Sequence, residues 1–153
     1  MESQIHIKTK LYRVCEKDIE ARIQTIEKNL KSIFESRDNE TKSSVGDKYE
    51  TGRAMLQIEE ANNKTQLIEA NRVKNELTRI DLKRSSIKAE IGSLVKTNRG
   101  YYYISIGLGK VTLEDTLYFC VSINSPIGTK LLSKTEGDAI EFNGKRIEIE
   151  EIW

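Results

Sequence analysis

The sequence is poor in the residues that usually build metal centres and redox sites. It contains one histidine, His6, and two cysteines, Cys15 and Cys120, among 153 residues. The two cysteines are far apart in the sequence and lack the short spacing of zinc or thiol-redox motifs. We therefore predict two isolated, buried thiols, and a single histidine leaves no imidazole cluster for a metal.

Long apolar runs are also missing. No stretch approaches the roughly 20 apolar residues that span a bilayer, and the opening MESQIHIKTK has no apolar signal core. The formal net charge of +1 favours neither a nucleic acid nor a membrane surface as partner. We therefore expect a cytoplasmic protein that does not contact a membrane.

Glycine and proline are scarce in the first half of the chain. Residues 8–84 contain two glycines and no proline, whereas residues 92–144 contain seven glycines. This change near residue 85 predicts helices first and short strands with turns afterwards. We therefore predict an α+β protein with two domains, residues 1–85 and 86–153.

Two apolar seams predict two long helices in the first domain. The first seam has steps of three and four residues, which is close to a heptad pattern and narrow enough to need one partner helix. The polar stretch 35–47 predicts a short turn, so the helices form an antiparallel coiled-coil hairpin about 45 Å long. The first seam comprises Tyr12, Cys15, Ile19, Ile23, Ile26, Leu30 and Ile33, and the second comprises Ala54, Ile58, Ala61, Thr65, Ile68, Ala70, Val73, Leu77 and Ile80.

Alternating apolar residues and turn signals predict a small β-rich second domain. Asn143-Gly144 is a strong two-residue hairpin signal. The one proline, Pro126, ends a strand and precedes a short helical turn over residues 127–132. The predicted strands cover residues 91–97, 100–107, 117–123, 138–142 and 146–152.

The segment VSINSPIGTKLLSKTEGD, residues 121–138, resembles the C-terminal signature of the bacterial Gre-type transcript-cleavage factors. IGSLVKT and EFNGKRIEIEEI resemble the opening strand and the terminal hairpin of the same family. The resemblance implies an FKBP-like β-rich domain after the helical hairpin, and a transcription elongation regulator that binds bacterial RNA polymerase through its secondary channel. It also implies that Asn124, Ser125 and Pro126 contact the rim of that channel.

The resemblance further implies that the protein is not itself an enzyme. Family members stimulate transcript cleavage by the polymerase, and thereby rescue backtracked or arrested complexes. Carboxylates at the hairpin tip help to hold a Mg²⁺ ion of the polymerase active site. We therefore expect a monomer with no cofactor of its own, a Mg²⁺ ion shared with the polymerase, and contact with RNA and DNA only within the elongation complex.

Four carboxylates near the predicted turn are candidate Mg²⁺ ligands. We expect Asp47 and Glu50 first, because two residues three apart at a helix start lie on one face, where the helix N-terminus favours negative charge. Asp38 and Glu40 are the alternates. Capping is the competing interpretation, in which Asp47 caps the second helix and Glu50 completes a capping box.

The family's acidic tip motif has no counterpart in KSSVGDKY, residues 42–49, where Lys42 and Val45 stand at its acidic positions. An alternative function is therefore a channel-occupying competitor without cleavage activity. A coiled-coil interaction module unrelated to polymerase is an alternative of another class, and a prolyl isomerase would need an apolar pocket. Residues 101–103, three consecutive tyrosines, are a candidate stacking surface for single-stranded RNA, although tyrosine is common in strands.

Overall fold

The computed structural model describes the backbone of residues 3–42 and 46–153, and the side chains of residues 3–39 and 50–153. Two long helices come first and strands follow, which confirms the predicted α+β class. Helix α1 covers Gln4–Lys42 and helix α2 covers Gly46–Thr78. Neither helix within the described ranges has an apolar stretch long enough to cross a membrane.

The chain divides into two compact units by contact. One unit contains Met1–Asp18 and Glu76–Trp153, and the other contains Ile19–Asn75. Helix α1 therefore contributes residues to both. The boundary predicted between residues 85 and 86 follows composition rather than contacts, and it stays a prediction.

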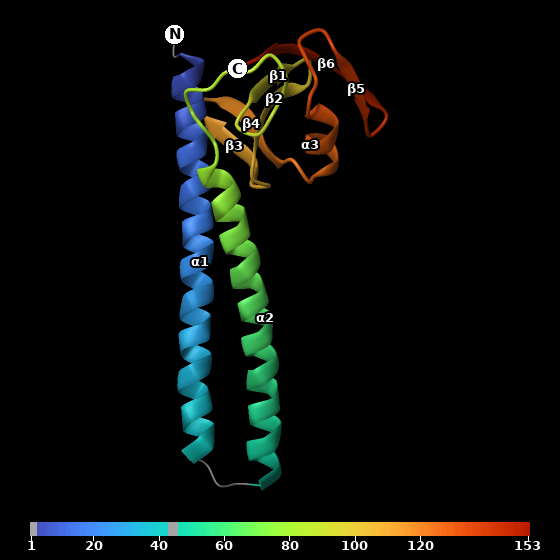
Figure 1. Ribbon diagram of the computed structural model, residues 1–153. Helices are drawn as coiled ribbons and strands as arrows, with labels where there is room; N and C mark the ends of the chain where they lie inside the picture. Colours follow the sequence, from blue (N-terminus) through green and yellow to red (C-terminus); the bar gives the residue numbers. More distant parts are fainter. Residues whose placement is uncertain (1–2, 43–45) are drawn as a thin grey trace. The chain divides into compact units, whose positions relative to one another are not determined.

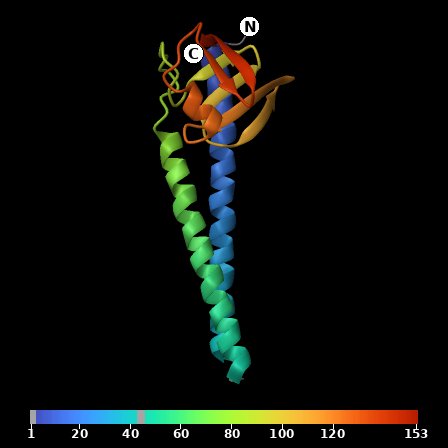
Figure 2. The ribbon, with the colours of Figure 1, turned by 90° about the vertical axis from the view of Figure 1, so that its right-hand side faces the viewer.

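In the helical unit, residues 19–42 of α1 run antiparallel alongside α2, as the two views in Figure 1 and Figure 2 show. The seam predicted on α1 is confirmed within this unit, because its isoleucines and its leucine are buried. These residues are Ile19, Ile23, Ile26, Leu30 and Ile33. A helix with one narrow apolar stripe buries that stripe against a single partner helix.

The seam predicted on the first half of α2 is wrong. Ile58 and Ile68 are 61% and 73% exposed. The inward face instead carries Leu56 and Leu67, which are half-buried, and a polar residue, Glu60, lies between them. The prediction placed the wrong face of α2 inward because it considered apolar residues only. The Glu60 side chain turns inward and forms an ion pair with Arg37 on α1. Farther along the chain, the predicted Ala70, Leu77 and Ile80 are buried.

The other unit contains a mixed sheet. In the described part of the chain six strands pair in the order β3-β4-β2-β1-β6-β5, with β2 and β4 parallel and the other neighbours antiparallel. The strands are β1 Leu94–Thr97, β2 Gly100–Ser105, β3 Gly109–Leu113, β4 Thr116–Ser122, β5 Ala139–Phe142 and β6 Lys145–Ile152, and helix α3 covers Pro126–Leu131. The sequence predicted every strand but β3, and it began β1 three residues too early.

Helical segments cover both faces of this sheet. On one face, Ile127 and Leu131 of α3 pack into a core with Val95 and Ile104 of the strands. The opposite face carries Tyr103 and Ser105 of β2, since side chains alternate along a strand. Residues 4–18 of α1 pack there, and Leu11 and Cys15 are fully buried. Figure 1 shows the strands between the N-terminal end of α1 and α3.

The two cysteines are buried, as predicted. Cys15 lies on α1 and Cys120 lies on β4. The Cys15 Sγ lies 3.5 Å from the Ser105 Oγ. Sequence spacing did not predict this contact, because it depends on how α1 packs on the sheet.

Candidate functional site

The loop after β4 is built from hydrogen bonds between its own residues. The Ser125 hydroxyl donates to the carbonyl oxygen of Ser122 at 2.7 Å and accepts from the backbone N–H of Gly128 at 3.0 Å. Ser125 is therefore the N-cap of α3, and Pro126 takes the first helical position, where its missing N–H costs nothing. The Thr129 hydroxyl closes the loop by donating to the carbonyl oxygen of Ile123 at 3.0 Å.

Gly128 is required by close packing rather than by its backbone angles. A Cβ at this position would lie 1.8 Å from the carbonyl oxygen of Ser122 and 2.9 Å from the Ser125 Oγ. Only a residue without a side chain lets the first turn of α3 approach the end of β4 so closely. The small residue in this motif therefore fixes the shape of the loop.

The three predicted rim-binding residues have different exposures. Asn124 and Pro126 are exposed, whereas Ser125 is half-buried and uses its hydroxyl inside the loop. The backbone N–H of Asn124 donates to the Ser122 Oγ at 3.1 Å, which holds the residue at the corner of the loop. The loop thus presents Asn124 and Pro126 outward on a scaffold that Ser125 stabilises.

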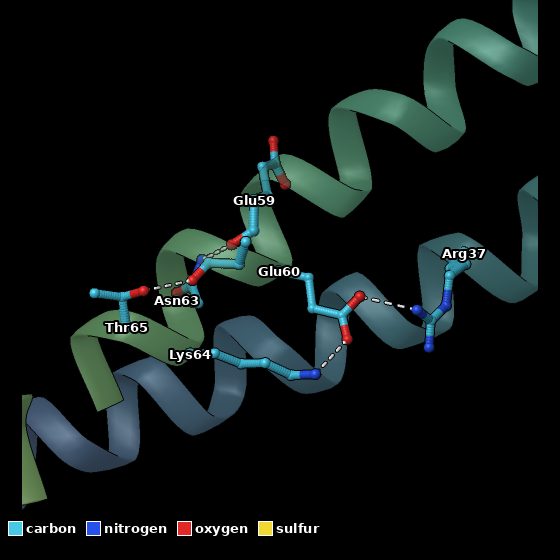
Figure 3. A network of polar contacts seen from close by, with 7 residues as sticks. Arg37, Glu59, Glu60, Asn63, Lys64 and Thr65 are labelled. Carbon is cyan, nitrogen blue, oxygen red and sulfur yellow. Dashed lines mark hydrogen bonds and ion pairs between the residues drawn. The ribbon is translucent and has the colours of Figure 1, made fainter. Parts of the chain in front are cut away.

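The second candidate region lies in the helical unit, toward the ends where α1 stops and α2 begins. Arg37 on α1 donates to Glu60 on α2 at 2.8 Å, and Lys64 contacts the other carboxylate oxygen at 2.9 Å (Figure 3). The guanidinium carbon of Arg37 lies 4.9 Å from the centre of the Phe34 ring. These contacts link the two helices at a position where the inward face of α2 is polar.

The charge of Glu60 is favoured by both of its partners. The hydrogen bond from Lys64, together with the charges of Arg37 and Lys64, keeps the pKa of this carboxyl below its ordinary value. Glu60 was missed as a structural residue by the sequence analysis. The available signal was its i,i+4 spacing to Lys64, which is typical of an ion pair on a helix.

The structure describes only some of the predicted Mg²⁺ ligands. Asp38 on α1 and Glu50 on α2 are exposed. Glu40 and Asp47 belong to the same helices, but their side chains lie outside the described residues. Among the side chains that are described, no three acidic, histidine or cysteine residues gather as a metal site. The ligand pair Asp47 and Glu50 therefore stays a prediction.

The three consecutive tyrosines face in different directions. Tyr103 is fully buried, so it cannot stack on RNA. Tyr101 pairs with Tyr118 at 5.1 Å between ring centres, and Tyr102 stacks on Phe119 at 5.3 Å. These cross-strand pairs between β2 and β4 stabilise the sheet. Packing within the sheet therefore explains the three consecutive tyrosines, and no ligand is needed to explain them.

A shallow hollow of about 350 Å³ lies beside α3 and β5. Its lining includes Lys130, Lys134 and Glu141 together with Leu132 and Ile140. The apolar pocket that a prolyl isomerase needs would be lined mainly by hydrophobic side chains. This hollow is too charged to meet that description.

Comparisons with known proteins give one similarity. No protein-family model and no curated protein matches the sequence. The solved structure of the transcription factor Gfh1 is similar to this chain with a TM-score of 0.36 and 16% sequence identity, over 88% of this chain and 89% of that chain. A likeness at this level carries no argument, so the proposals that follow depend on the chain's own residues.

Proposed function

We propose that this chain is a transcription elongation regulator that binds bacterial RNA polymerase. In this proposal the α1–α2 pair enters the secondary channel, and the loop after β4 contacts the rim of the channel. The observation that supports it best is the loop itself. The residues that resemble the Gre signature form a capped helix start, and Asn124 and Pro126 face outward from it.

The helical unit supports the same proposal. Helix α2 contains 33 residues, which at 1.5 Å per residue gives a length of about 50 Å. It packs against α1 through a buried seam and through the Arg37–Glu60 ion pair. Two packed helices are stiffer than a single helix. A segment that enters a narrow channel must be stiff in this way.

The protein would act through the active site of the polymerase rather than as an enzyme. Hydrolysis of an RNA backbone by two metal ions requires carboxylate ligands for the second ion and an oriented water molecule. Asp47 and Glu50 near the start of α2 would complete such a site and share its Mg²⁺ ion, with Asp38 and Glu40 as alternates. Without such a pair at the tip, the protein would occupy the channel and compete with cleavage factors.

Binding to purified bacterial RNA polymerase tests the first part of the proposal. We expect Asn124→Ala and Pro126→Ala to weaken binding about tenfold each, which is the effect of losing a central interface contact. Thr112→Ala is the matched control, because Thr112 is an exposed polar residue on β3 of the same unit. Equal affinity of all four proteins, wild type included, would refute docking through this loop.

A backtracked elongation complex with labelled RNA tests the second part. We expect the protein to accelerate shortening of the transcript, and we expect Asp47→Asn or Glu50→Gln to abolish that acceleration. Glu59→Gln is the control, because Glu59 is an exposed carboxylate on the same helix, more than two turns away. Binding without shortening, together with competition against an authentic cleavage factor, would favour the competitor.

A second candidate function is a helical interaction module unrelated to polymerase. The exposed apolar residues on α2 favour it, because Met55, Ile58 and Ile68 are each more than half exposed. This function predicts no detectable affinity for the polymerase in the binding assay. It also predicts that Ile58→Lys leaves the fold intact but abolishes binding to the partner.

A further inference from the structure

The β5–β6 hairpin ends in a two-residue turn, Asn143-Gly144, at one edge of the sheet. Both residues are exposed, and their φ angles are 52° and 74°. Phe142 and Lys145 face each other across the hairpin, and in the described part of the chain β5 pairs with no strand except β6. The turn is therefore open to water and belongs to a hairpin that is held on one side only.

An asparagine followed by glycine is chemically labile. The backbone nitrogen of the next residue attacks the side-chain carboxamide carbon, and glycine hinders this attack least because it has no Cβ. A Cβ at Gly144 would meet nothing within 4 Å, so the surroundings leave room for the movement. Neither the Asn143 side chain nor the Gly144 N–H has a hydrogen bond among the described residues. No such bond has to break before the two groups meet.

A second asparagine occupies a comparable turn but is held by hydrogen bonds. Asn98 lies between β1 and β2 and is also exposed. Its Oδ1 accepts from the backbone N–H of Glu148 at 2.8 Å. The N–H that would attack, on Arg99, donates to the Thr97 Oγ1 at 3.0 Å. Attack at Asn98 therefore requires two hydrogen bonds to break first.

The third asparagine in a turn is restrained in a similar way. Asn124 is exposed, but the N–H of the next residue, Ser125, donates to the carbonyl oxygen of Ser122 at 3.1 Å. The remaining asparagines lie in α1 and α2, where the following N–H donates within the helix. Among the asparagines of the described residues, Asn143 is therefore the one whose attacking N–H is available.

We propose that Asn143 is a site of spontaneous deamidation, which adds a negative charge to the hairpin turn and converts part of the chains to isoaspartate. The Gly144 nitrogen loses its proton and attacks the Asn143 carboxamide carbon. The C–NH₂ bond breaks, and ammonia leaves with that proton. Water then opens the resulting cyclic imide at either carbonyl carbon, which gives aspartate or isoaspartate. One water is consumed and one ammonia is released, and no oxidant or cofactor takes part.

The isoaspartate product changes the edge of the sheet. In this product the main chain runs through the former side chain, which adds one CH₂ to the turn. Turn length sets which residues pair across a hairpin, so the backbone pairing of Phe142 with Lys145 is weakened. Phe142 also packs against the apolar core of the unit. The outer end of β5 is therefore looser in the isoaspartate form.

Incubation of the folded, full-length chain in heavy-oxygen water at mildly alkaline pH, followed by peptide mapping, tests this inference, which is independent of the proposed function. We expect Asn143 to gain one heavy oxygen atom, and its aspartate and isoaspartate peptides to separate by chromatography. Asn98 and Asn124 are internal controls in the same digest. We expect them to react more slowly by about tenfold, because each attacking N–H must first leave a hydrogen bond.

Hydrogen exchange measures the consequence for β5. We expect the amide of Phe142 to exchange faster in the isolated isoaspartate form than in Asn143→Asp, which carries the same charge without the added CH₂. Labelling of Asn98 or Asn124 as fast as that of Asn143, or reaction of Asn143 only in urea, would overturn the inference. Equal exchange of Phe142 in the two forms would overturn the loosening of β5.

Discussion

Gly128 offers a sharp test of the loop after β4, because one added methyl group decides the outcome. Without steric conflict, Gly128→Ala would stabilise the chain, since alanine is favoured over glycine inside a helix by about 1 kcal/mol. In this structure the new Cβ would lie 1.8 Å from the Ser122 carbonyl oxygen, whereas real Cβ contacts are essentially never under 3.0 Å. The first turn of α3 or the end of β4 must therefore move by about 1 Å or more.

The size of that effect follows from the two opposing contributions. Overpacking in a well-packed region costs about 1–3 kcal/mol, and a clash with backbone lies at the upper end because the carbonyl cannot rotate away. Subtracting the helix preference leaves a net loss of about 2 kcal/mol. For a chain of this size that loss lowers Tm by roughly 4–8 °C.

Thermal unfolding followed by Trp153 fluorescence measures the change in Tm of the unit that contains this loop. The backbone of Trp153 exchanges hydrogen bonds with Leu94 at 2.9 and 3.0 Å, so its fluorescence reports on the sheet. Gly107→Ala is the control, because a Cβ there meets nothing within 4 Å. A Gly128→Ala protein that melts at or above the wild-type temperature would refute the packing described for this loop.

Two further predictions concern single polar groups. The Tyr103 hydroxyl is buried and has no hydrogen-bond partner among the described residues, so Tyr103→Phe should raise the free energy of unfolding by about 1 kcal/mol in urea titration; a loss of stability would reveal a partner for the hydroxyl. The pKa of Glu60 is lowered in the folded chain by Lys64 and Arg37. The stabilisation of the folded chain by the ionised Glu60 carboxylate should be complete above the unfolded pKa of about 4.3. It should disappear as the pH falls through the folded pKa. The Tm difference between wild type and Glu60→Gln should therefore be present at pH 7 and shrink as the pH falls into the acid range, and a difference that stays constant over that range would contradict the ion pair.

Two of the tight turns of the sheet show what a sequence reveals about a strand. Asn143 and Gly144 have φ angles of 52° and 74°, and Asn-Gly is the usual sequence for such a turn, so the last hairpin was predictable. Glu114 and Asp115 adopt φ angles of 47° and 66° between β3 and β4. Glutamate rarely adopts this backbone conformation, so the sequence carries no turn signal there and β3 was missed.

The helices show a different limit. On α1 the isoleucines and the leucine of the predicted seam recur on one face, so their spacing alone identified the buried seam. On α2 two faces compete, one with Ile58 and Ile68 and the other with Leu56 and Leu67. The face that turns inward also carries Glu60, whose partner Arg37 lies on the other helix. A pairing between helices cannot be obtained from the periodicity of one helix.

The candidate loop was predictable in position but not in the roles of its residues. Pro126 indicated the end of a strand and the start of a helical turn, and both are present. The sequence could not separate Asn124, which faces outward, from Ser125, whose hydroxyl is used within the loop. That distinction depends on the close approach at Gly128, which no local pattern predicts.

The central position of β1 has a consequence for the order in which the chain folds during synthesis. Leu94 in β1 pairs with Trp153, and β6 separates β1 from β5. The N-terminal residues of α1, which the ribosome makes first, contact β2 through Cys15 and Ser105, and β1 needs residue 153. Folding of the sheet-containing unit therefore waits until that residue has left the ribosomal tunnel, whereas the helical pair can form much earlier.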